Sequence, residues 1–270
     1  MKNWSESKEE RRIRKAREKA DLPIVAEKST AETLSTATRF VTCLKYGNKY
    51  GPEYVNNLYN MVKRNLTIEH EFVCFTENSE GLDPAIRVEP LPVTSEIQGW
   101  WYKPFFFNPK LEIKGTILFL DLDIIIFRNI DHLFAYKPGE FLIIRDFNRC
   151  QIKNYNKFNS SVFRLETGNH SNVYTNFIKE ARNIIRKYPG DQDWIRASID
   201  SGFEFWPDDW IQSYKWEMRG RPKMNSAPRG TKDFLTPGNP KILDETSIAV
   251  FHGDPNPHIC KDPWVVDNWK

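Results

Sequence analysis

Cysteine is scarce in this sequence: there are four among 270 residues, and no two of them form a C-x-x-C pair. A disulfide framework or a zinc ribbon is therefore not expected, and a reducing, cytoplasmic location is the simplest reading. No stretch approaches the roughly 20 apolar residues that a transmembrane helix needs. The basic N-terminus lacks the apolar segment that follows the charges of a secretory signal. The sequence predicts neither a membrane span nor a disulfide-stapled domain.

Apolar and aromatic residues, in contrast, are plentiful. Hydrophobic residues make up 40% of the chain and charged residues 28%, which is the balance of a soluble globular protein and excludes general disorder. The aromatic share is 14%, with 9 Trp and 18 Phe. Such side chains build a core, and flat indole faces also bind sugar rings and nucleobases.

Positive charge is concentrated at the N-terminus. Residues 1–20 hold eight Lys or Arg and four Glu, whereas the whole chain has a net charge of +3, so the remainder sums to about −1. The pair Ser7 and Glu10 has the spacing of a helix capping box, and residues 21–38 have the composition of a linker. We expect residues 1–38 to form a charged helical arm. A solvated helix is its plainest role, and an electrostatic contact with nucleic acid is the alternative.

Short apolar segments alternate with helical patterns in the body of the chain. Residues 39–46 are predicted as a strand, residues 52–64 as a helix opened by proline, and residues 71–76 as a second strand. This βαβ order implies a parallel sheet and an α/β fold. Further strands are predicted at 116–126, 140–146, 157–165 and 247–251, and further helices at 99–110, 130–134, 171–188 and 191–199.

Two carboxylates follow the strongest strand pattern. Asp121 and Asp123 lie at or just past the carboxyl end of an apolar strand, which is the edge where open α/β sheets bind ligands. Residues two apart on an extended chain point the same way, so both carboxylates can converge on one hard cation. The plainer alternative is that they begin a loop and face water.

A histidine follows the last predicted strand in the same manner. His252 precedes Gly253, whose lack of a side chain lets the backbone approach a ligand. Together with the two aspartates, His252 would give a mixed oxygen and imidazole site, suited to Mn²⁺ and workable for Mg²⁺. His258 is the rival candidate, and a packed or surface role is the alternative for either histidine.

Six segments in order resemble the family 8 glycosyltransferases of the glycogenin type. They are FVTCLKYGNKYGPEYVNNL, YKPFFF, ILFLDLDIIIFRNIDHLF, FNSSVFRL, GDQDWI and FHGDPNPH, and they run from about residue 39 to about residue 260. The resemblance implies that residues 39–270 form a single GT-A (Rossmann-like) domain with a mixed, mostly parallel central sheet flanked by helices. It also implies a retaining enzyme that moves a sugar from a nucleotide sugar, such as a UDP-sugar, to a hydroxyl acceptor.

The resemblance also implies roles for individual residues. Asp121, Asp123 and His252 would bind Mn²⁺ or Mg²⁺, and Asp191 and Gln192 would lie beside the donor sugar. Asp191 is expected to orient the sugar or stabilise its positive charge, and capping of the following helix is the alternative role. The remaining expected donor contacts are Thr42, Tyr50, Lys103, Asp121, Asn159 and Gly253. Lys103 is also expected to be catalytic, by adding a fixed positive charge or a hydrogen bond to the sugar.

Two positions depart from the family pattern. Asn256 stands where the family has a lysine that resembles a diphosphate clamp, so Lys261 or Lys103 would have to supply that charge. Ser161 replaces a glycine and narrows the space beside the sugar. Within the unassigned segment 202–245, three aromatic residues are spaced i, i+4, i+8, which favours a core-facing helix over a wall for the acceptor. These residues are Trp206, Trp210 and Tyr214.

Two other function classes remain open at this stage. FLDLDIIIF resembles the first motif of haloacid-dehalogenase-type phosphohydrolases, with Asp121 as nucleophile and Asp123 as acid. Against that class, two strands precede the motif and no clear lysine motif follows it. The non-enzyme alternative is a nucleotide-sugar or nucleic-acid binding module without turnover, which Asn256 and the basic arm would fit.

Overall fold

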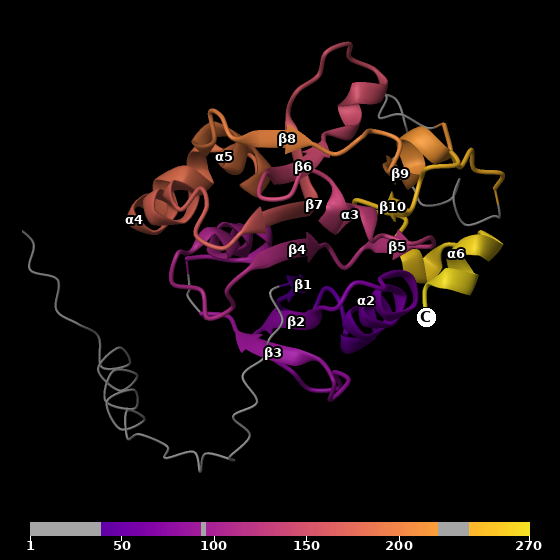
Figure 1. The fold of residues 1–270 in the computed structure, drawn as a ribbon, viewed down its shortest axis with the longest axis horizontal. Coiled ribbons are helices and arrows are strands. Elements are labelled where there is room, and N and C mark those ends of the chain that lie inside the picture. The colour runs from indigo at the N-terminus through magenta and orange to yellow at the C-terminus, as the bar shows by residue number, and fades with distance from the viewer. Residues whose placement is uncertain (1–38, 93–95, 221–237) are drawn as a thin grey trace, which may run out of the picture. The chain divides into compact units, whose positions relative to one another are not determined.

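A computed structural model describes the fold of residues 39–92, 96–220 and 238–270. The predicted charged arm lies outside the described residues. The main sheet has seven strands in the order β3-β2-β1-β4-β7-β6-β8 (Figure 1). In that order the strands are β3 (Arg87–Pro90), β2 (Glu71–Thr76), β1 (Arg39–Lys45), β4 (Thr116–Leu120), β7 (Phe158–Glu166), β6 (Phe141–Arg145) and β8 (Phe203–Phe205).

Neighbouring strands of this sheet are mostly parallel. The predicted βαβ unit is present: β1 pairs in parallel with β2, and Val41 lies opposite Phe72. The parallel pairs β2–β3, β1–β4 and β6–β8 continue the pattern, whereas β7 runs antiparallel to both β4 and β6. The expected mixed, mostly parallel central sheet is therefore confirmed. Because β7 is reversed, its first residues lie at the same edge as the last residues of β4.

Both faces of the sheet are covered. Successive side chains of a strand point to opposite faces, and accordingly Ile117 and Phe119 of β4 join one hydrophobic cluster while Leu118 and Leu120 join the other. Helix α2 (Pro52–Asn65) and the single-turn helix α3 (His132–Ala135) pack with the second cluster. The 3₁₀ helix η1 (Gly99–Phe107), α4 (Asn172–Lys187) and α5 (Asp191–Ser198) pack with the first. Figure 1 shows α4 and α5 on one side of the strands and α2 on the other.

The predicted strand 116–126 is wrong in one respect, because the chain breaks in the middle of it. After β4 the chain turns at residues 121–123 and continues as β5 (Ile124–Ile126) in a second sheet, whose order is β5-β10-β9. The other strands of this sheet are β10 (Ile248–Val250) and β9 (Ile211–Ser213). All three residues of β5 are buried. The apolar residues continue on both sides of the aspartates because β4 and β5 are both buried, although the two strands belong to different sheets. The two aspartates lie at the corner between β4 and β5.

The predicted helix through residues 206–214 is also wrong. This segment forms β9 followed by a π-helical turn, η3 (Tyr214–Met218). The burial that the spacing indicated is nevertheless present at its ends, since Trp206 is 2% and Tyr214 0% exposed. These two buried aromatic residues lie in a loop and in a π-helical turn on either side of β9, an arrangement that periodicity over so few residues does not separate from a helix.

The remaining elements are short. They are η2 (Phe147–Cys150), η5 (Pro257–Ile259) and α6 (Pro263–Asn268). Within residues 39–92, 96–220 and 238–270, no helix combines the length and the apolar character needed to cross a bilayer.

Candidate functional site

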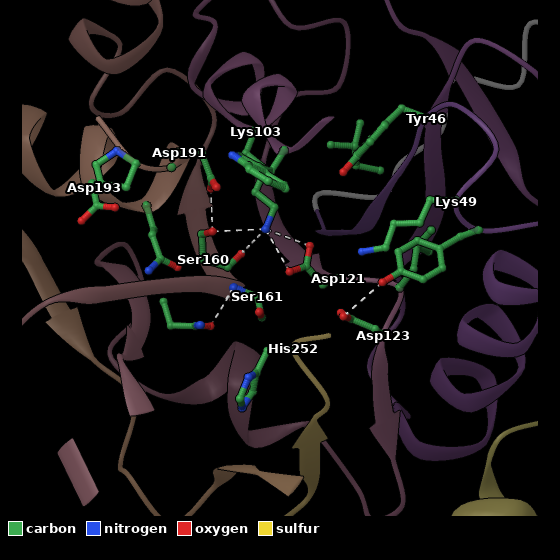
Figure 2. A pocket seen from close by; sticks show the side chains of 18 residues that line it. Tyr46, Lys49, Lys103, Asp121, Asp123, Ser160, Ser161, Asp191, Asp193 and His252 are labelled. Atoms are coloured by element: carbon green, nitrogen blue, oxygen red, sulfur yellow. Dashed lines mark hydrogen bonds and ion pairs between the residues drawn. The ribbon is translucent and has the colours of Figure 1, made fainter. Parts of the chain in front are cut away.

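A cleft of about 380 Å³ opens at the carboxyl edge of the main sheet. Its walls come from the end of β1 and the segment after it, from η1, from the corner after β4, from the start of β7, from the start of α5, and from His252 in the loop after β10. In open α/β sheets this edge is the usual place for a ligand. Figure 2 shows that side chains distant in sequence point into this one space.

The corner after β4 places two carboxylates in the cleft. The backbone N–H of Asp121 donates to the carbonyl of Ser161 (2.8 Å), and the carbonyl of Asp123 accepts from the N–H of Phe251 (3.0 Å). The corner is thereby tied to β7 and to the end of β10. Leu122, between the aspartates, is 3% exposed and packs into the core. Both aspartates line the cleft, although the chain turns here instead of continuing as the extended strand that the prediction assumed.

Lys103 lies beneath the first of these carboxylates. Its Nζ lies 2.9 Å from Asp121 and donates to the carbonyl and the hydroxyl of Ser160, both at 3.1 Å (Figure 2). Burial lowers the pKa of Lys103, but Asp121 and Asp191 outweigh that effect and raise it overall. Burial raises the pKa of Asp121 to about 6, although Lys103 opposes the shift. Lys103 as a whole is 5% exposed, and because its pKa is raised, its ammonium group stays charged.

Asp191 is joined to the same network through a hydroxyl. The Oγ of Ser160 donates to Asp191 Oδ2 at 2.6 Å. Asp191 is 5% exposed, and burial raises its pKa while Lys103 and the Ser160 hydroxyl oppose the shift. The alternative role as the helix N-cap is corrected, because Gly190 occupies the N-cap of α5 and Asp191 is the first helical residue. Asp191 lines the cleft, where its carboxylate accepts the Ser160 hydroxyl.

Asp123 lies in a separate corner with Tyr50. The hydroxyl of Tyr50 lies 3.2 Å from Asp123 Oδ2 and 3.3 Å from Asn256 Oδ1, and the N–H of Gly253 lies 3.4 Å from Asp123 Oδ2. Burial, followed by the charge of Asp123, raises the pKa of Tyr50, so the phenol stays protonated and donates. The loop after β10 is thus connected to the carboxylate pair.

His252 lines the cleft, but its ring is engaged elsewhere. Its Nε2 lies 2.5 Å from the hydroxyl of Ser213, and the imidazole stacks on Phe147 and meets the edge of Trp216. Burial, followed by the charge of Lys215, lowers the pKa of His252 to about 3, so the ring is neutral. A neutral imidazole is the form that binds metals.

Asp121, Asp123 and His252 fit a divalent cation only in part. Asp121 and Asp123 supply the hard oxygen ligands that Mn²⁺ and Mg²⁺ accept. In the part of the chain that the structure describes, however, no three metal-binding side chains are gathered around one point. His252 would have to leave Ser213 to join the two carboxylates. The metal ligands named from the sequence therefore stay a prediction.

The other predicted site residues divide into two groups. Asn159 and Gln192 line the cleft, as does the substituted position Ser161, whose N–H donates to Asn159 Oδ1. Thr42 does not line it: this residue is 0% exposed in the middle of β1, opposite Val73 and Phe119, and the strand reaches the cleft only at Leu44. The rival His258 also lies elsewhere, hydrogen-bonded through Nδ1 to the hydroxyl of Tyr54.

Several cleft residues were not singled out from the sequence. Among them are Tyr46, Lys49, Trp100, Ser160 and Asp193. Tyr46 and Lys49 follow the carboxyl end of a predicted strand, and that position alone was a usable signal. Burial, followed by the charge of Asp121, raises the pKa of Tyr46 to about 12. Trp100 is 49% exposed on the rim, a position that no pattern in the sequence indicates.

Comparisons with known proteins find the fold but not a close relative. No protein-family model and no curated protein matches the sequence. The galactosyltransferase LgtC, solved with donor and acceptor sugar analogs, is 11% identical and covers 85% of this chain and 93% of its own, with a TM-score of 0.56. The glycosyltransferase GlyE of Streptococcus pneumoniae TIGR4 is 12% identical and covers 81% of this chain and 56% of its own, with a TM-score of 0.56. The bifunctional glycosyltransferase WbbM is 11% identical and covers 88% of this chain and 52% of its own, with a TM-score of 0.53.

These likenesses concern the fold, since all three identities lie between 11% and 12%. The three neighbours are glycosyltransferases, and each covers more than four fifths of this chain. The GT-A fold that the six sequence segments implied is therefore confirmed.

Proposed function

We propose that this protein is a metal-dependent, retaining glycosyltransferase that moves a sugar from a nucleotide sugar, most simply a UDP-sugar, to a hydroxyl acceptor. The observation that carries the proposal is the convergence of Asp121, Asp123, Lys103 and Asp191 on one cleft of a GT-A fold. The six segments that resemble family 8 enzymes supply these same residues. Sugar transfer is also the activity named for the structural neighbours.

The chemistry requires charge of both signs. A nucleotide sugar breaks its bond to a diphosphate, which gains negative charge, while the sugar carbon gains positive charge. Asp191 is a fixed, buried carboxylate at the cleft wall, which suits it to stabilise the positive sugar carbon. Lys103 holds Asp121 and Ser160 in place, and Ser160 in turn holds Asp191. One hydrogen-bonded chain therefore connects the predicted metal end of the cleft to the predicted sugar end.

A divalent cation would supply charge neutralisation to the departing diphosphate when bound. Asp121 and Asp123 would hold it, because both are carboxylates that face the cleft. His252 is neutral and borders the same cleft, which fits a third ligand once Ser213 is released.

The phosphohydrolase alternative receives less support. That reading needs Asp121 as a free nucleophile, whereas its carboxylate is ion-paired with a buried lysine at 2.9 Å. The chain also shares its fold with glycosyltransferases over more than four fifths of its length.

The direct test is a screen of nucleotide sugars by thermal melting and by release of nucleoside diphosphate. With Mn²⁺ present, the preferred UDP-sugar at 100 times its Kd is expected to stabilise the fold by about 2.7 kcal/mol. EDTA is expected to abolish both stabilisation and slow hydrolysis of the donor. The proposal fails if no nucleotide sugar stabilises the protein, particularly if a generic phosphate ester is hydrolysed instead.

Replacing Asp123 tests the predicted metal ligands. Asp123→Asn keeps the size of the side chain but removes a charge that the cation needs, so Mn²⁺ affinity is expected to fall by about tenfold or more. UDP affinity and turnover are expected to fall with it. Titration of Mn²⁺ and UDP into the variant by calorimetry measures both effects. Asp267→Asn, at an exposed position of α6, is the matched control and is expected to change neither affinity. Unchanged Mn²⁺ binding in Asp123→Asn would remove this residue from the metal site.

A further inference from the structure

The cleft carries more negative than positive charge. Among the described residues that line it, four are aspartates and two are lysines, which gives a formal charge of −2 when all are ionised. A diphosphate is itself anionic and is repelled from such a surface unless cations offset the charge. The two lysines are Lys49 and Lys103, and they differ sharply in their surroundings.

Lys103 is already committed to a carboxylate. Its Nζ is 2.9 Å from Asp121, and its two other contacts, at 3.1 Å, are with Ser160. An ammonium group with these three partners has no donor left for a ligand. Lys261, the other lysine expected to compensate for Asn256, does not line the cleft.

Lys49 has no carboxylate partner among the described residues. The side chain is exposed, and its Nζ lies 4.7 Å from the centroid of the Tyr50 ring. Figure 2 shows the ammonium group directed into the cleft, on the side of Asp123 and away from Asp191. All three of its N–H donors are therefore available to an incoming anion.

The ring of Tyr50 connects Lys49 to Asp123 and Asn256, the two positions expected to act on a bound diphosphate. The Tyr50 hydroxyl lies 3.2 Å from Asp123, a predicted metal ligand, and 3.3 Å from Asn256. Asn256 is the position at which the sequence lacks the expected lysine. Lys49, Tyr50 and Asp123 thus form one corner of the cleft, and Asn256 is joined to this corner through the Tyr50 hydroxyl.

Lys215, another lysine near this corner, is hydrogen-bonded to backbone carbonyls. The Nζ of Lys215 donates to the carbonyls of His252 (3.2 Å) and Asp254 (2.6 Å). These bonds hold the loop after β10, and Lys215 does not line the cleft. Its role is therefore to position that loop rather than to meet a ligand.

We propose that Lys49 binds the diphosphate of the nucleotide-sugar donor and supplies the positive charge that position 256 lacks. This inference rests on the proposed function. The charge reaches the site from the segment after β1 instead of from the loop after β10. Because Asn256 contacts the hydroxyl of the ring that Lys49 covers, a lysine introduced at position 256 would bring its charge to the same corner.

The first experiment measures binding of UDP and of uridine by calorimetry in the presence of Mn²⁺. Lys49→Met keeps most of the aliphatic stem and removes the charge, so UDP affinity is expected to fall about tenfold. Uridine has no phosphate, and its affinity is expected to stay the same. Lys63→Met is the matched control, because Lys63 is also an exposed lysine over a tyrosine ring, 5.9 Å from the centroid of Tyr59, but does not line the cleft. It is expected to leave UDP affinity unchanged.

The second experiment is a charge relocation. The double variant Lys49→Met with Asn256→Lys is expected to recover most of the UDP affinity lost in the single variant. Unchanged UDP affinity in Lys49→Met, or an equal loss for UDP and uridine, would overturn the inference and leave the proposed function standing, because the wild type still binds UDP. If the wild-type protein binds no nucleoside diphosphate, the proposed function fails and the inference fails with it.

Discussion

Asp191→Asn is expected to lower kcat by about a hundred- to a thousandfold, the usual cost of losing one preorganised electrostatic group. The positive charge that develops on the sugar is stabilised by a fixed carboxylate more than the neutral ground state is. Asp191 is 5% exposed and held at 2.6 Å by the hydroxyl of Ser160, so it cannot turn away from the cleft without losing that bond. Asparagine keeps the size of the side chain and an oxygen to accept the same hydroxyl, so folding is expected to change little.

Turnover and UDP affinity are measured separately for this variant. UDP affinity is expected to stay at the wild-type value, because Asp121 and Asp123 are intact. Asp200→Asn is the matched control: it lies just beyond the same helix, is exposed, and does not line the cleft. Near-normal kcat in Asp191→Asn would exclude this carboxylate from the mechanism and leave it a purely structural partner of Ser160.

Lys103→Met is expected to affect both stability and activity. The variant removes the ammonium group that faces Asp121 at 2.9 Å and leaves a carboxylate without its partner. Breaking one side of a buried ion pair typically costs about 3 to 5 kcal/mol. The Asp121 side chain keeps 24% of its surface exposed, so we expect the lower end, about 3 kcal/mol, in the free energy of unfolding. Donor turnover is expected to be lost as well, because Ser160 and Asp191 lose their anchor.

The loss of stability is expected to depend on pH. Burial already raises the pKa of Asp121 to about 6 with Lys103 in place, and removing the lysine raises it further. The folded variant therefore binds this proton more tightly than the folded wild-type protein does, whereas the two unfolded chains bind it equally, so the deficit grows as the pH rises from about 5 to about 8 and shrinks as the pH falls. Urea unfolding of the metal-free protein at both pH values measures this difference. Lys110→Met, at an exposed position after η1, is expected to change stability by less than about 0.5 kcal/mol at either pH. A deficit that does not change with pH would show that Lys103 does not control the charge of Asp121.

Much of the fold follows from local patterns in the sequence. The strand predicted at 71–76 is β2 without change, and the helix predicted at 52–64 is α2, extended by one residue. Such segments are recognisable because their apolar residues repeat with the period of the element itself. The reversal of β7 was not recognisable, because strand direction depends on the path of the whole chain.

Some errors came from the same local patterns. The apolar run 116–126 continues without interruption through the aspartates, although the chain changes sheets there. Trp206 and Tyr214 are buried as expected, but from a loop and a turn instead of a helix. In both cases the burial of the side chains was predicted correctly and the backbone conformation was not. Hydrophobicity indicates whether a side chain is buried, but it does not indicate the path of the backbone that carries it.

The sequence by itself determined the cleft edge and the carboxylates at it. Asp121 and Asp123 could be named because they follow a strand end, a position that carries ligands for a local, geometric reason, whereas Asp191 could be named only because its segment GDQDWI resembles the family 8 motif. Thr42, which the resemblance implied as a donor contact, lies in the middle of β1 and does not reach the same edge. Only the tertiary structure decided that Lys103 is paired with Asp121 while Lys49 has no carboxylate partner in the part of the chain that the structure describes. Ion pairs depend on the distances between segments that are far apart in sequence, and the spacing of residues along the chain does not give those distances.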